Sequence, residues 1–396
     1  MADYNNKIEL HLFLIWNAAY YKLEEIICDI SKNFKILKKL EIQWNKDRFS
    51  ENLTQFYGTK LVDNSFKEKH CGNGPFTIII VEDHKVNYDY RKTSKGKKNV
   101  NVNMFDLKMK YRKMTGGGHK IHATNSNFET KHDLMLLLGQ TPEEIKVNDK
   151  SSSQCIHRDI EGVDGWKDLS HLFKILNNTI KYVVLRNFES FTDNKLDGDI
   201  DLLTDNPNEL HFIMKAKKIH KNKRRAAYLV KINNQDVFVD IRYLKDNYYD
   251  ENWQSEMIIN RYLCKDGYFI LDSYNYFYSL LYHSIIHKPH MSNKYEERLK
   301  EMLLSIELEL IDIGNHDWKY VLSKFLFEKN YLITIPKDFS VFFNYKFSSK
   351  YRKDINSEII RAIRSTLIKI KKKINENNLQ YYFYNLFSLV LFKLFF

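Results

Sequence analysis

The first 140 or so residues alternate between apolar runs and stretches with apolar side chains at helical spacing. Residues 8–16 are almost unbroken in apolar character, which favours a strand buried on both faces. Residues 20–35 then carry apolar side chains three and four positions apart, as on one face of a helix. Further strands are predicted at 36–44 and 74–83, and helices at 47–57, 103–113 and 127–138. This alternation predicts a compact α/β sandwich of about 140 residues.

A second unit is predicted after a polar segment, NDKSSSQ at 148–154. Its pattern gives a helix, two strands, another helix, and then two strands joined by the polar turn NNQD, which is typical of a hairpin. From residue 273 the pattern becomes helical. The expected domains are residues 1–147, a linker at 148–164, a mixed-sheet domain at 165–310 and a helical region at 311–396.

Composition supports a globular protein and adds a preference for anionic partners. Of the 396 residues, 43% are hydrophobic and 28% charged, which excludes a disordered chain. Lys and Arg number 62 against 50 Asp and Glu, a net charge of +12 that favours nucleotides, nucleic acid or an acidic membrane surface. The four cysteines lie far apart, and the N-terminus lacks a signal-peptide pattern, so we expect a cytoplasmic protein without a disulfide scaffold.

The segment TGGGHKIHATNS places His122 after a glycine-rich turn and just before a predicted helix. Ser126 and Glu129 have the spacing of a capping box at the start of that helix. A helix N-terminus favours anions, and a neutral imidazole beside it can attack a phosphoryl group. His122 is therefore a candidate phosphohistidine nucleophile, whereas His119 and His132 are interpreted as ordinary polar residues. The alternative is a domain that binds anions without turnover.

The run HATNS with Glu129, together with NLTQFYG and HCGNGPFTIIIVED, resembles nucleoside diphosphate kinases over about residues 8–145. The resemblance implies a ferredoxin-like sandwich, an active histidine at His122 and a phosphate-contacting tyrosine at Tyr57. The chain departs from the family at Asn17, where a lysine is usual, and at His119, where an asparagine is usual. The family's phosphate-binding arginines have no unambiguous counterpart. The candidates to replace them are Arg91, Lys108 and Arg112.

Three aspartates in the second unit form another candidate site. Asp199 and Asp201 lie two apart on a predicted strand and so point to one face, and Asp240 lies central in a later strand. Clustered carboxylates bind Mg²⁺, which prefers oxygen ligands together with substrate phosphates. Because such carboxylates repel one another until a cation arrives, replacing Asp199 or Asp201 by alanine is expected to leave the fold intact. The alternative is a solvated acidic loop with Asp240 as a structural residue.

The sequences GDIDLL, VDIR and SLLYHSIIHK resemble the nucleotidyltransferase superfamily that includes DNA polymerase beta, over about residues 165–300. They are most similar to uncharacterised members associated with bacterial surface-polysaccharide gene sets. The resemblance implies a mixed sheet and Asp199, Asp201 and Asp240 as catalytic metal ligands. The usual Gly-Ser pair that binds the triphosphate is missing. Arg186, Asn187 and Ser190 occupy its region and are the candidate nucleotide-binding residues.

The C-terminal segment combines six basic residues at 361–373 with an apolar, aromatic run to residue 396. This pattern predicts a helix on an anionic membrane surface, with a helix packed against the body as the alternative. Nucleic acid is not expected as a partner, since no recognised motif supports it, and oligomerisation is left open.

The two constellations together predict a transferase with kinase-like and nucleotidyltransferase-like halves. We expect a Mg²⁺-dependent nucleotidyl- or phosphoryl-transferase that uses a nucleoside triphosphate such as ATP and a small or sugar-linked acceptor, in polysaccharide biosynthesis. The alternative is a non-catalytic nucleotide-binding protein with a regulatory or assembly role and two degenerate sites.

Overall fold

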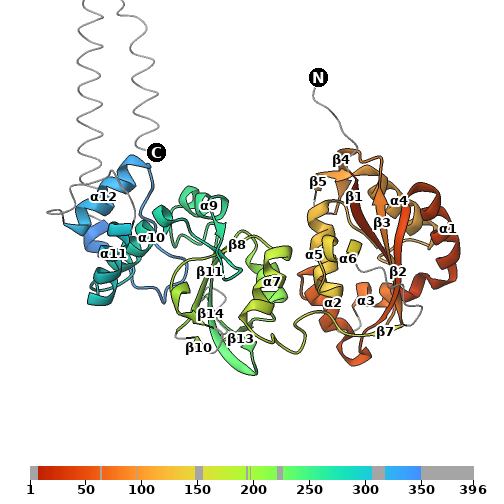
Figure 1. Ribbon diagram of the computed structural model, residues 1–396, viewed down its shortest axis with the longest axis horizontal. Helices are drawn as coiled ribbons and strands as arrows, with labels where there is room; N and C mark the ends of the chain where they lie inside the picture. The colour runs from red at the N-terminus through yellow and green to blue at the C-terminus, as the bar shows by residue number, and fades with distance from the viewer. Residues whose placement is uncertain are drawn as a thin grey trace, which may run out of the picture. The chain divides into compact units, whose positions relative to one another are not determined.

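The computed structural model describes most of the chain as two compact units. The described residues are 8–62, 65–94, 96–147, 155–192, 195–196, 198–220, 226–305 and 317–348. The first unit comprises residues 1–276 together with the segment 334–340, and the second comprises 277–333 and 341–396. The fold is mixed α/β, as predicted (Figure 1). The boundaries predicted at residues 147, 165 and 311 stay predictions.

The first sheet of the first unit has the strand order β6-β1-β3-β2-β7. Neighbouring strands pair antiparallel, except that β7 pairs parallel to β2. All seven residues of β1 are buried, which agrees with the apolar run in the sequence. The strands are β1 (Glu9–Ile15), β2 (Lys35–Gln43), β3 (Phe76–Asp83), β6 (Ile121–Ala123) and β7 (Ile156–His157).

Alternate side chains of this sheet enter two cores, one on each face. On one face, Phe13 and Ile15 pack with residues of helices α1 and α4. On the other face, Leu12 and Leu14 pack with residues of α2 and α5, in a core that continues into the second sheet. Figure 1 shows the two helix pairs on opposite sides of the strands. The helices of this region are α1 (Leu23–Asn33), α2 (Phe49–Tyr57), α3 (Phe66–Cys71), α4 (Val102–Met114), α5 (Asn127–Leu138) and α6 (Pro142–Val147).

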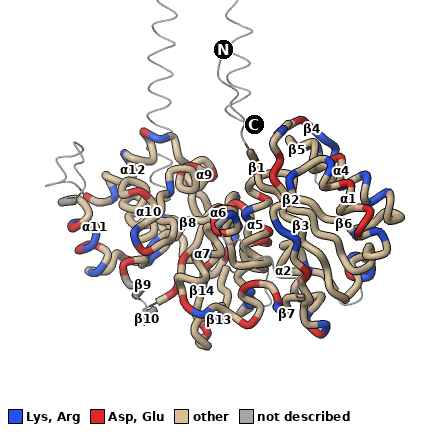
Figure 2. The backbone as a smooth tube through the Cα atoms, turned by 45° about the vertical axis from the view of Figure 1, so that its right-hand side comes forward, with Lys and Arg blue, Asp and Glu red and all other residues tan. Residues whose placement is uncertain are grey.

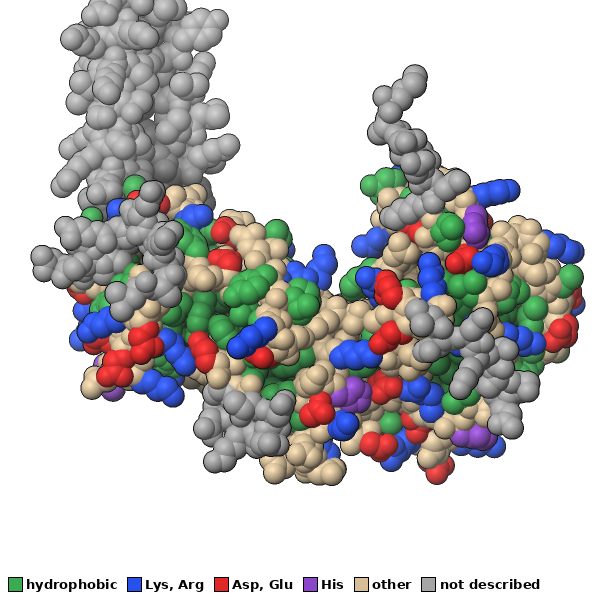
Figure 3. Space-filling model, viewed as in Figure 1, with side chains coloured by type: hydrophobic (Ala, Val, Ile, Leu, Met, Phe, Trp, Pro, Cys, Tyr) green, Lys and Arg blue, Asp and Glu red, His purple; other side chains and the backbone are tan. Residues whose placement is uncertain are grey.

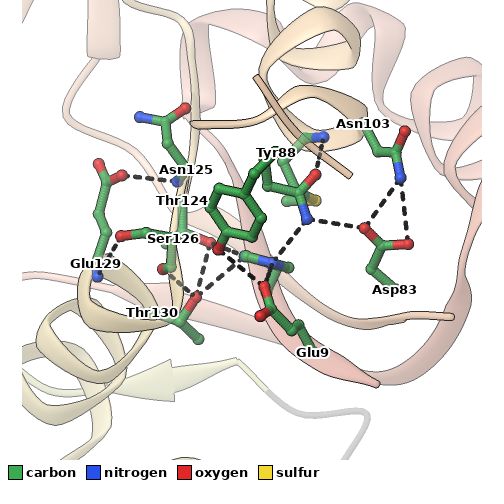
Figure 4. A network of polar contacts seen from close by, with 12 residues as sticks. Glu9, Asp83, Tyr88, Asn103, Thr124, Asn125, Ser126, Glu129 and Thr130 are labelled. Atoms are coloured by element: carbon green, nitrogen blue, oxygen red, sulfur yellow. Dashed lines mark hydrogen bonds and ion pairs between the residues drawn. The ribbon is translucent and has the colours of Figure 1, made fainter. Parts of the chain in front are cut away.

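A hairpin that the sequence pattern did not predict precedes α4. It consists of β4 (Tyr88–Thr93) and β5 (Gly96–Asn101), which are largely exposed and rich in Lys and Arg (Figure 2). Its base is fixed by a buried polar network (Figure 4), in which the Tyr88 hydroxyl donates to Glu9 at 2.8 Å. The Asn101 side-chain amide donates to Asp83 at 2.8 Å and lies 3.2 Å from Nε2 of His11.

The second sheet has the order β12-β13-β14-β11-β8-β16-β15 and is mixed. The predicted hairpin is confirmed: β13 and β14 pair antiparallel, and both turn residues, Asn233 and Asn234, have positive φ, as tight hairpin turns require. The strands are β8 (Tyr182–Val184), β11 (Ile200–Thr204), β12 (Lys217–Lys218), β13 (Ala227–Ile232), β14 (Gln235–Tyr243), β15 (Tyr262–Leu263) and β16 (Phe269–Ile270), beside a separate two-stranded sheet of β9 (Phe191–Thr192) and β10 (Lys195–Leu196). The accompanying helices are α7 (Leu169–Thr179), α8 (Pro207–Ile213) and α9 (Glu251–Ile259).

Residues 155–164, within the expected linker, are packed against the first sheet. β7 extends that sheet, and Ile160 and Val163 are buried in the core. The Asn52 side chain donates to Asp159 at 2.6 Å, which ties the segment to α2.

Helices dominate the described part of the C-terminal region, as the pattern from residue 273 predicts. They are α10 (Ser273–Ile286), α11 (Asn293–Ser305) and α12 (Trp318–Glu328). Tyr278 of α10 stacks on Phe325 of α12 with ring centroids 3.8 Å apart. None of the helices described is long and apolar enough to cross a membrane. The basic and apolar segment at 361–396 lies outside the described residues.

Positive and negative side chains are interspersed on the face of the protein drawn in Figure 3. The net charge of +12 is therefore not gathered into one patch on that face. An anionic partner that binds to this face would therefore meet local clusters of charge and not a single basic surface.

Candidate functional site

His122 lies in β6 and points toward α2 and α5. Its Cα is paired with Leu14 of β1, so the pleat places it on the Leu14 face, while Ile121 and Ala123 enter the opposite core. The residue is 9% exposed, and its ring contacts the ring of Phe56 edge-on, with centroids 5.5 Å apart. His122 is thus a largely buried imidazole held by a strand at the sheet edge.

Asp133 of α5 holds this imidazole by a short hydrogen bond. Nε2 of His122 lies 2.6 Å from a carboxylate oxygen of Asp133, and since a carboxylate accepts, Nε2 carries the proton. Burial raises the pKa of Asp133, but its interactions and hydrogen bonds with the imidazoles of His122 and His132 lower it more, so the net shift is downward. Asp133 therefore stays ionised and leaves Nδ1 of His122 as the nitrogen with a free lone pair.

Tyr57, the predicted phosphate-contacting residue, lies at the end of α2 beside His122. The two rings meet edge-on with centroids 6.0 Å apart. The ammonium group of Lys67, on α3, lies 3.0 Å from the centroid of the Tyr57 ring. Burial raises the pKa of Tyr57, so the hydroxyl stays protonated and can donate a hydrogen bond. Lys67 adds a cation that the sequence analysis missed.

Two of the three predicted phosphate-binding cations lie along β6, one on each side of His122. Lys108 donates to the backbone carbonyl of Ala123 at 3.1 Å, and Nε of Arg112 donates to that of Ile121 at 2.8 Å. Burial lowers the pKa of Lys108 to about 8 and also lowers that of Arg112. The structure places Arg91 elsewhere, in β4, where it forms ion pairs with Asp89 and Asp106.

The capping box predicted before α5 is confirmed. Ser126 accepts a hydrogen bond from the backbone N–H of Glu129 at 3.2 Å, and Glu129 accepts one from the N–H of Asn125 at 2.7 Å. Glu129 is therefore used at the helix N-terminus. The acid that contacts His122 is Asp133, one turn further along α5.

The departures from the kinase pattern have structural roles here. The side chain of Asn17 fills the space next to Gly74, where any Cβ atom would overlap it. The backbone N–H of His119 points to Nδ1 of His70 at 3.4 Å, and Gly118, with φ +79°, leaves room for that ring. The Asn17 side chain thus packs against the loop at residues 72–74, and the His119 ring lies beside that of His70, with centroids 5.8 Å apart.

The three predicted aspartates lie on or just before two adjacent central strands of the second sheet. Asp201 of β11 is directly paired with Asp240 of β14 across parallel strands, and Asp199 immediately precedes β11. Burial raises the pKa of both Asp199 and Asp201, and the charge of Asp240 raises each further. The three carboxylates therefore lie close enough to repel one another.

Two buried arginines compensate part of this negative charge. Nη2 of Arg186 donates to Asp201 at 2.6 Å, and Nη2 of Arg242 donates to Asp240 at 3.0 Å. Arg242 also pairs with Asp338 at 3.3 Å, on the segment 334–340 that returns to the first unit. Of the predicted nucleotide-binding residues, Arg186 is thus at the carboxylates, while Asn187 and Ser190 lie in the turn that follows β8.

The three aspartates supply oxygen donors of the kind that a magnesium site uses, but they are not arranged as in a formed metal site. Across the described ranges, no three His, Cys, Asp or Glu side chains are placed as the ligands of one metal ion. Arg186 occupies a carboxylate oxygen of Asp201 that a cation would use. The donor chemistry and the mutual repulsion suit a divalent cation, with which Arg186 would compete for that oxygen.

Sequence reasoning missed Asp133, Lys67 and Arg242, and treated His132 as an ordinary polar residue. A signal for Asp133 exists in hindsight, because it lies on the inner face of a helix whose capping box the sequence does predict. Lys67 reaches Tyr57 through a tertiary contact that no local spacing records, and so does Asp338, which pairs with Arg242.

No protein-family model matches the chain, and no curated protein matches it. Among solved structures, the chain is similar to the nucleoside diphosphate kinase of Aquifex aeolicus, with a TM-score of 0.24 and 13% sequence identity. The match covers 35% of this chain and 99% of that one. A likeness of this size carries no argument about activity, which rests on the geometry above.

Proposed function

We propose that the first lobe of the first unit, residues 8–147, is a phosphotransferase that carries a phosphoryl group on His122 and takes it from a nucleoside triphosphate. The observation that supports this most directly is the 2.6 Å contact between Nε2 of His122 and Asp133. It fixes the proton on Nε2 and leaves Nδ1 as the nucleophile, which is the arrangement that covalent histidine catalysis needs.

The surroundings of His122 suit a phosphorylated substrate. Lys108, Arg112 and Lys67 supply positive charge, and Tyr57 supplies a hydroxyl donor. The strand order β6-β1-β3-β2 also agrees with the ferredoxin-like sandwich expected for this half. Charged groups of this kind stabilise a transferring phosphoryl group by position and charge alone.

Phosphoryl transfer to His122 predicts a chemically distinctive label. Incubating the full chain with Mg²⁺ and a γ-labelled nucleoside triphosphate should give an acid-labile, alkali-stable label on histidine. The label should fall to background in His122→Ala, because this substitution removes the proposed nucleophile. The matched control is His171→Ala, which removes an imidazole paired with Glu161 at 3.2 Å and should keep the label. An unlabelled wild type would reduce the lobe to the alternative, a nucleotide-binding module with a regulatory or assembly role.

A second activity is proposed for the second sheet, because Asp201 and Asp240 are directly paired on adjacent strands and Asp199 lies just before the first of them. We propose that Asp199, Asp201 and Asp240 hold Mg²⁺ for nucleotidyl transfer, with Arg186 released to bind phosphate. Magnesium would neutralise the carboxylates and polarise the phosphates of the nucleotide. Asn187 and Ser190 remain proposed nucleotide contacts.

Metal binding at this site should strengthen as the pH rises. A carboxyl group with a raised pKa keeps its proton to a higher pH, so protons compete with the cation below that point. Titration with Mn²⁺, as a paramagnetic probe for Mg²⁺, should show this dependence, and Asp199→Asn should weaken binding by at least about tenfold. The control is Asp205→Asn, an exposed carboxylate after the same strand. Equal Mn²⁺ binding by wild type and Asp199→Asn would exclude the site.

We also propose an acceptor substrate and a place in the cell for this protein. A small or sugar-linked acceptor in surface-polysaccharide biosynthesis, and contact of residues 361–396 with the anionic inner face of the membrane, are proposed from the sequence. In the proposed membrane contact, each basic residue near the anionic lipid surface would contribute about 1 kcal/mol to binding.

A further inference from the structure

Asp133 is shared by two histidines, although the reaction proposed above needs only one. One carboxylate oxygen lies 2.6 Å from Nε2 of His122, and the other lies 2.8 Å from Nδ1 of His132. On the far side of His132, Nε2 lies 3.6 Å from a carboxylate oxygen of Glu209, on α8. His132 is 7% exposed and Asp133 is 2% exposed. The four side chains form a nearly buried row from β6 through α5 to α8.

The row holds two carboxylates, and one of them, Asp133, contacts both imidazoles, so a positive charge on one imidazole disfavours a positive charge on the other. His132 lies between two carboxylates, whereas His122 contacts only one. Burial lowers the pKa of His132, but the hydrogen bond to Asp133 and the charges of Asp133 and Glu209 outweigh burial, so the net shift is upward. The proton is therefore favoured on His132.

The other charged groups near the row preserve this difference. Glu129 of α5 adds negative charge that favours protonation of His132. Lys108 of α4 also interacts with Asp133 through its charge, and Arg112 with Tyr57, on the side of His122. The ring of Phe56, from α2, contacts both histidines. Cations near His122 and carboxylates near His132 both place the proton on His132.

We propose that His132 is a positioning residue that holds the positive charge beside Asp133, so that His122 stays neutral with its proton on Nε2. This rests on the proposed role of His122 as nucleophile. In the step it serves, Nδ1 of His122 forms a bond to the γ-phosphorus as the bond to the β,γ-bridging oxygen breaks. The nucleoside diphosphate leaves with that electron pair, and the Nε2 proton stays in the hydrogen bond to Asp133.

The test replaces His132 by glutamine, which can still donate to Asp133 but carries no charge. His122 then becomes the sole imidazole on the carboxylate and binds a proton more readily. The acid limb of the pH profile of labelling should move up by about one pH unit, so that labelling falls severalfold at pH 6 and little at pH 8. Glu209→Gln should move the limb the same way by less, and it keeps the test valid if His132→Gln does not fold. The matched control is His171→Gln, which should leave the profile unchanged.

Nitrogen-15 NMR of the unlabelled full chain separates this inference from the proposed function. At pH 7 we expect His132 to be protonated on both nitrogens and His122 to be neutral with hydrogen on Nε2. A neutral His132 beside a cationic His122, or a labelling profile that neither variant moves, would overturn the assignment. If no label forms at all, the phosphotransferase proposal fails, and the NMR spectra still decide where the charge lies.

Discussion

Replacing Asp201 by alanine should destabilise the protein by about 3–5 kcal/mol, because it leaves a buried guanidinium without its carboxylate. Arg186 and Asp201 are both largely buried, and Nη2 of Arg186 lies 2.6 Å from the carboxylate. Burial and the neighbouring carboxylates raise the pKa of Asp201, so the pair is costly to form. Removing only Asp201 is costlier still, because the guanidinium of Arg186 stays buried away from solvent and loses the carboxylate that offsets its charge.

Asp199 provides the matched comparison, because it belongs to the same carboxylate cluster but is exposed. Asp199→Ala should change the free energy of unfolding by no more than about 0.5 kcal/mol. Urea unfolding of the full chain, with and without Mg²⁺, measures both variants. Equal stabilities of Asp199→Ala and Asp201→Ala would show that Arg186 finds another partner. The sequence-based expectation that either change leaves the fold intact is therefore kept for Asp199 and reversed for Asp201.

The sequence predicted the strands and helices that carry an apolar pattern. The buried run of β1, the helical spacing of α5 and the turn between β13 and β14 each have a local cause in side-chain type. The hairpin β4–β5 has no such pattern, because most of its side chains are polar and more than half of its residues are exposed. Its base is fixed instead by Asp83 and Glu9, which lie elsewhere in the chain.

The candidate sites were predictable only where their residues share a local pattern. His122 follows a glycine-rich turn, and Asp199 and Asp201 share a strand face, so spacing alone selects them. The partners that set their charge come from other elements: Asp133 from the following helix, Asp338, which pairs with Arg242, from the segment 334–340, and Glu209 from α8. Charge at a site depends on these tertiary contacts, which spacing does not record.

Replacing Asp133 is expected to have the largest effect on the proposed phosphotransfer. In Asp133→Ala, two buried imidazoles lose their acceptor, at about 1–3 kcal/mol each, so the protein should be less stable by about 3 kcal/mol. The proton of His122 would no longer be held on Nε2, and labelling should fall by about 10²–10⁴-fold. Asp29→Asn is the matched control, because that carboxylate accepts from Lys110 and Tyr111 at the surface, on the opposite face of the sheet.

Asp133→Asn separates the effect on stability from the effect on charge, since it keeps the shape of the side chain. Folding lowers the pKa of Asp133 below its value of about 3.9 in the unfolded chain. The charge of Asp133 therefore stabilises the folded protein when the pH is above about 3.9. This stabilisation is lost as the pH falls through the pKa that Asp133 has in the folded protein. The stability difference between wild type and Asp133→Asn should therefore be full at pH 6–7 and shrink below about pH 4. Thermal unfolding across this range measures it. If the stability difference between wild type and Asp133→Asn does not change with pH, Asp133 acts by packing. Its charge would then play no part in the row with His132 and Glu209.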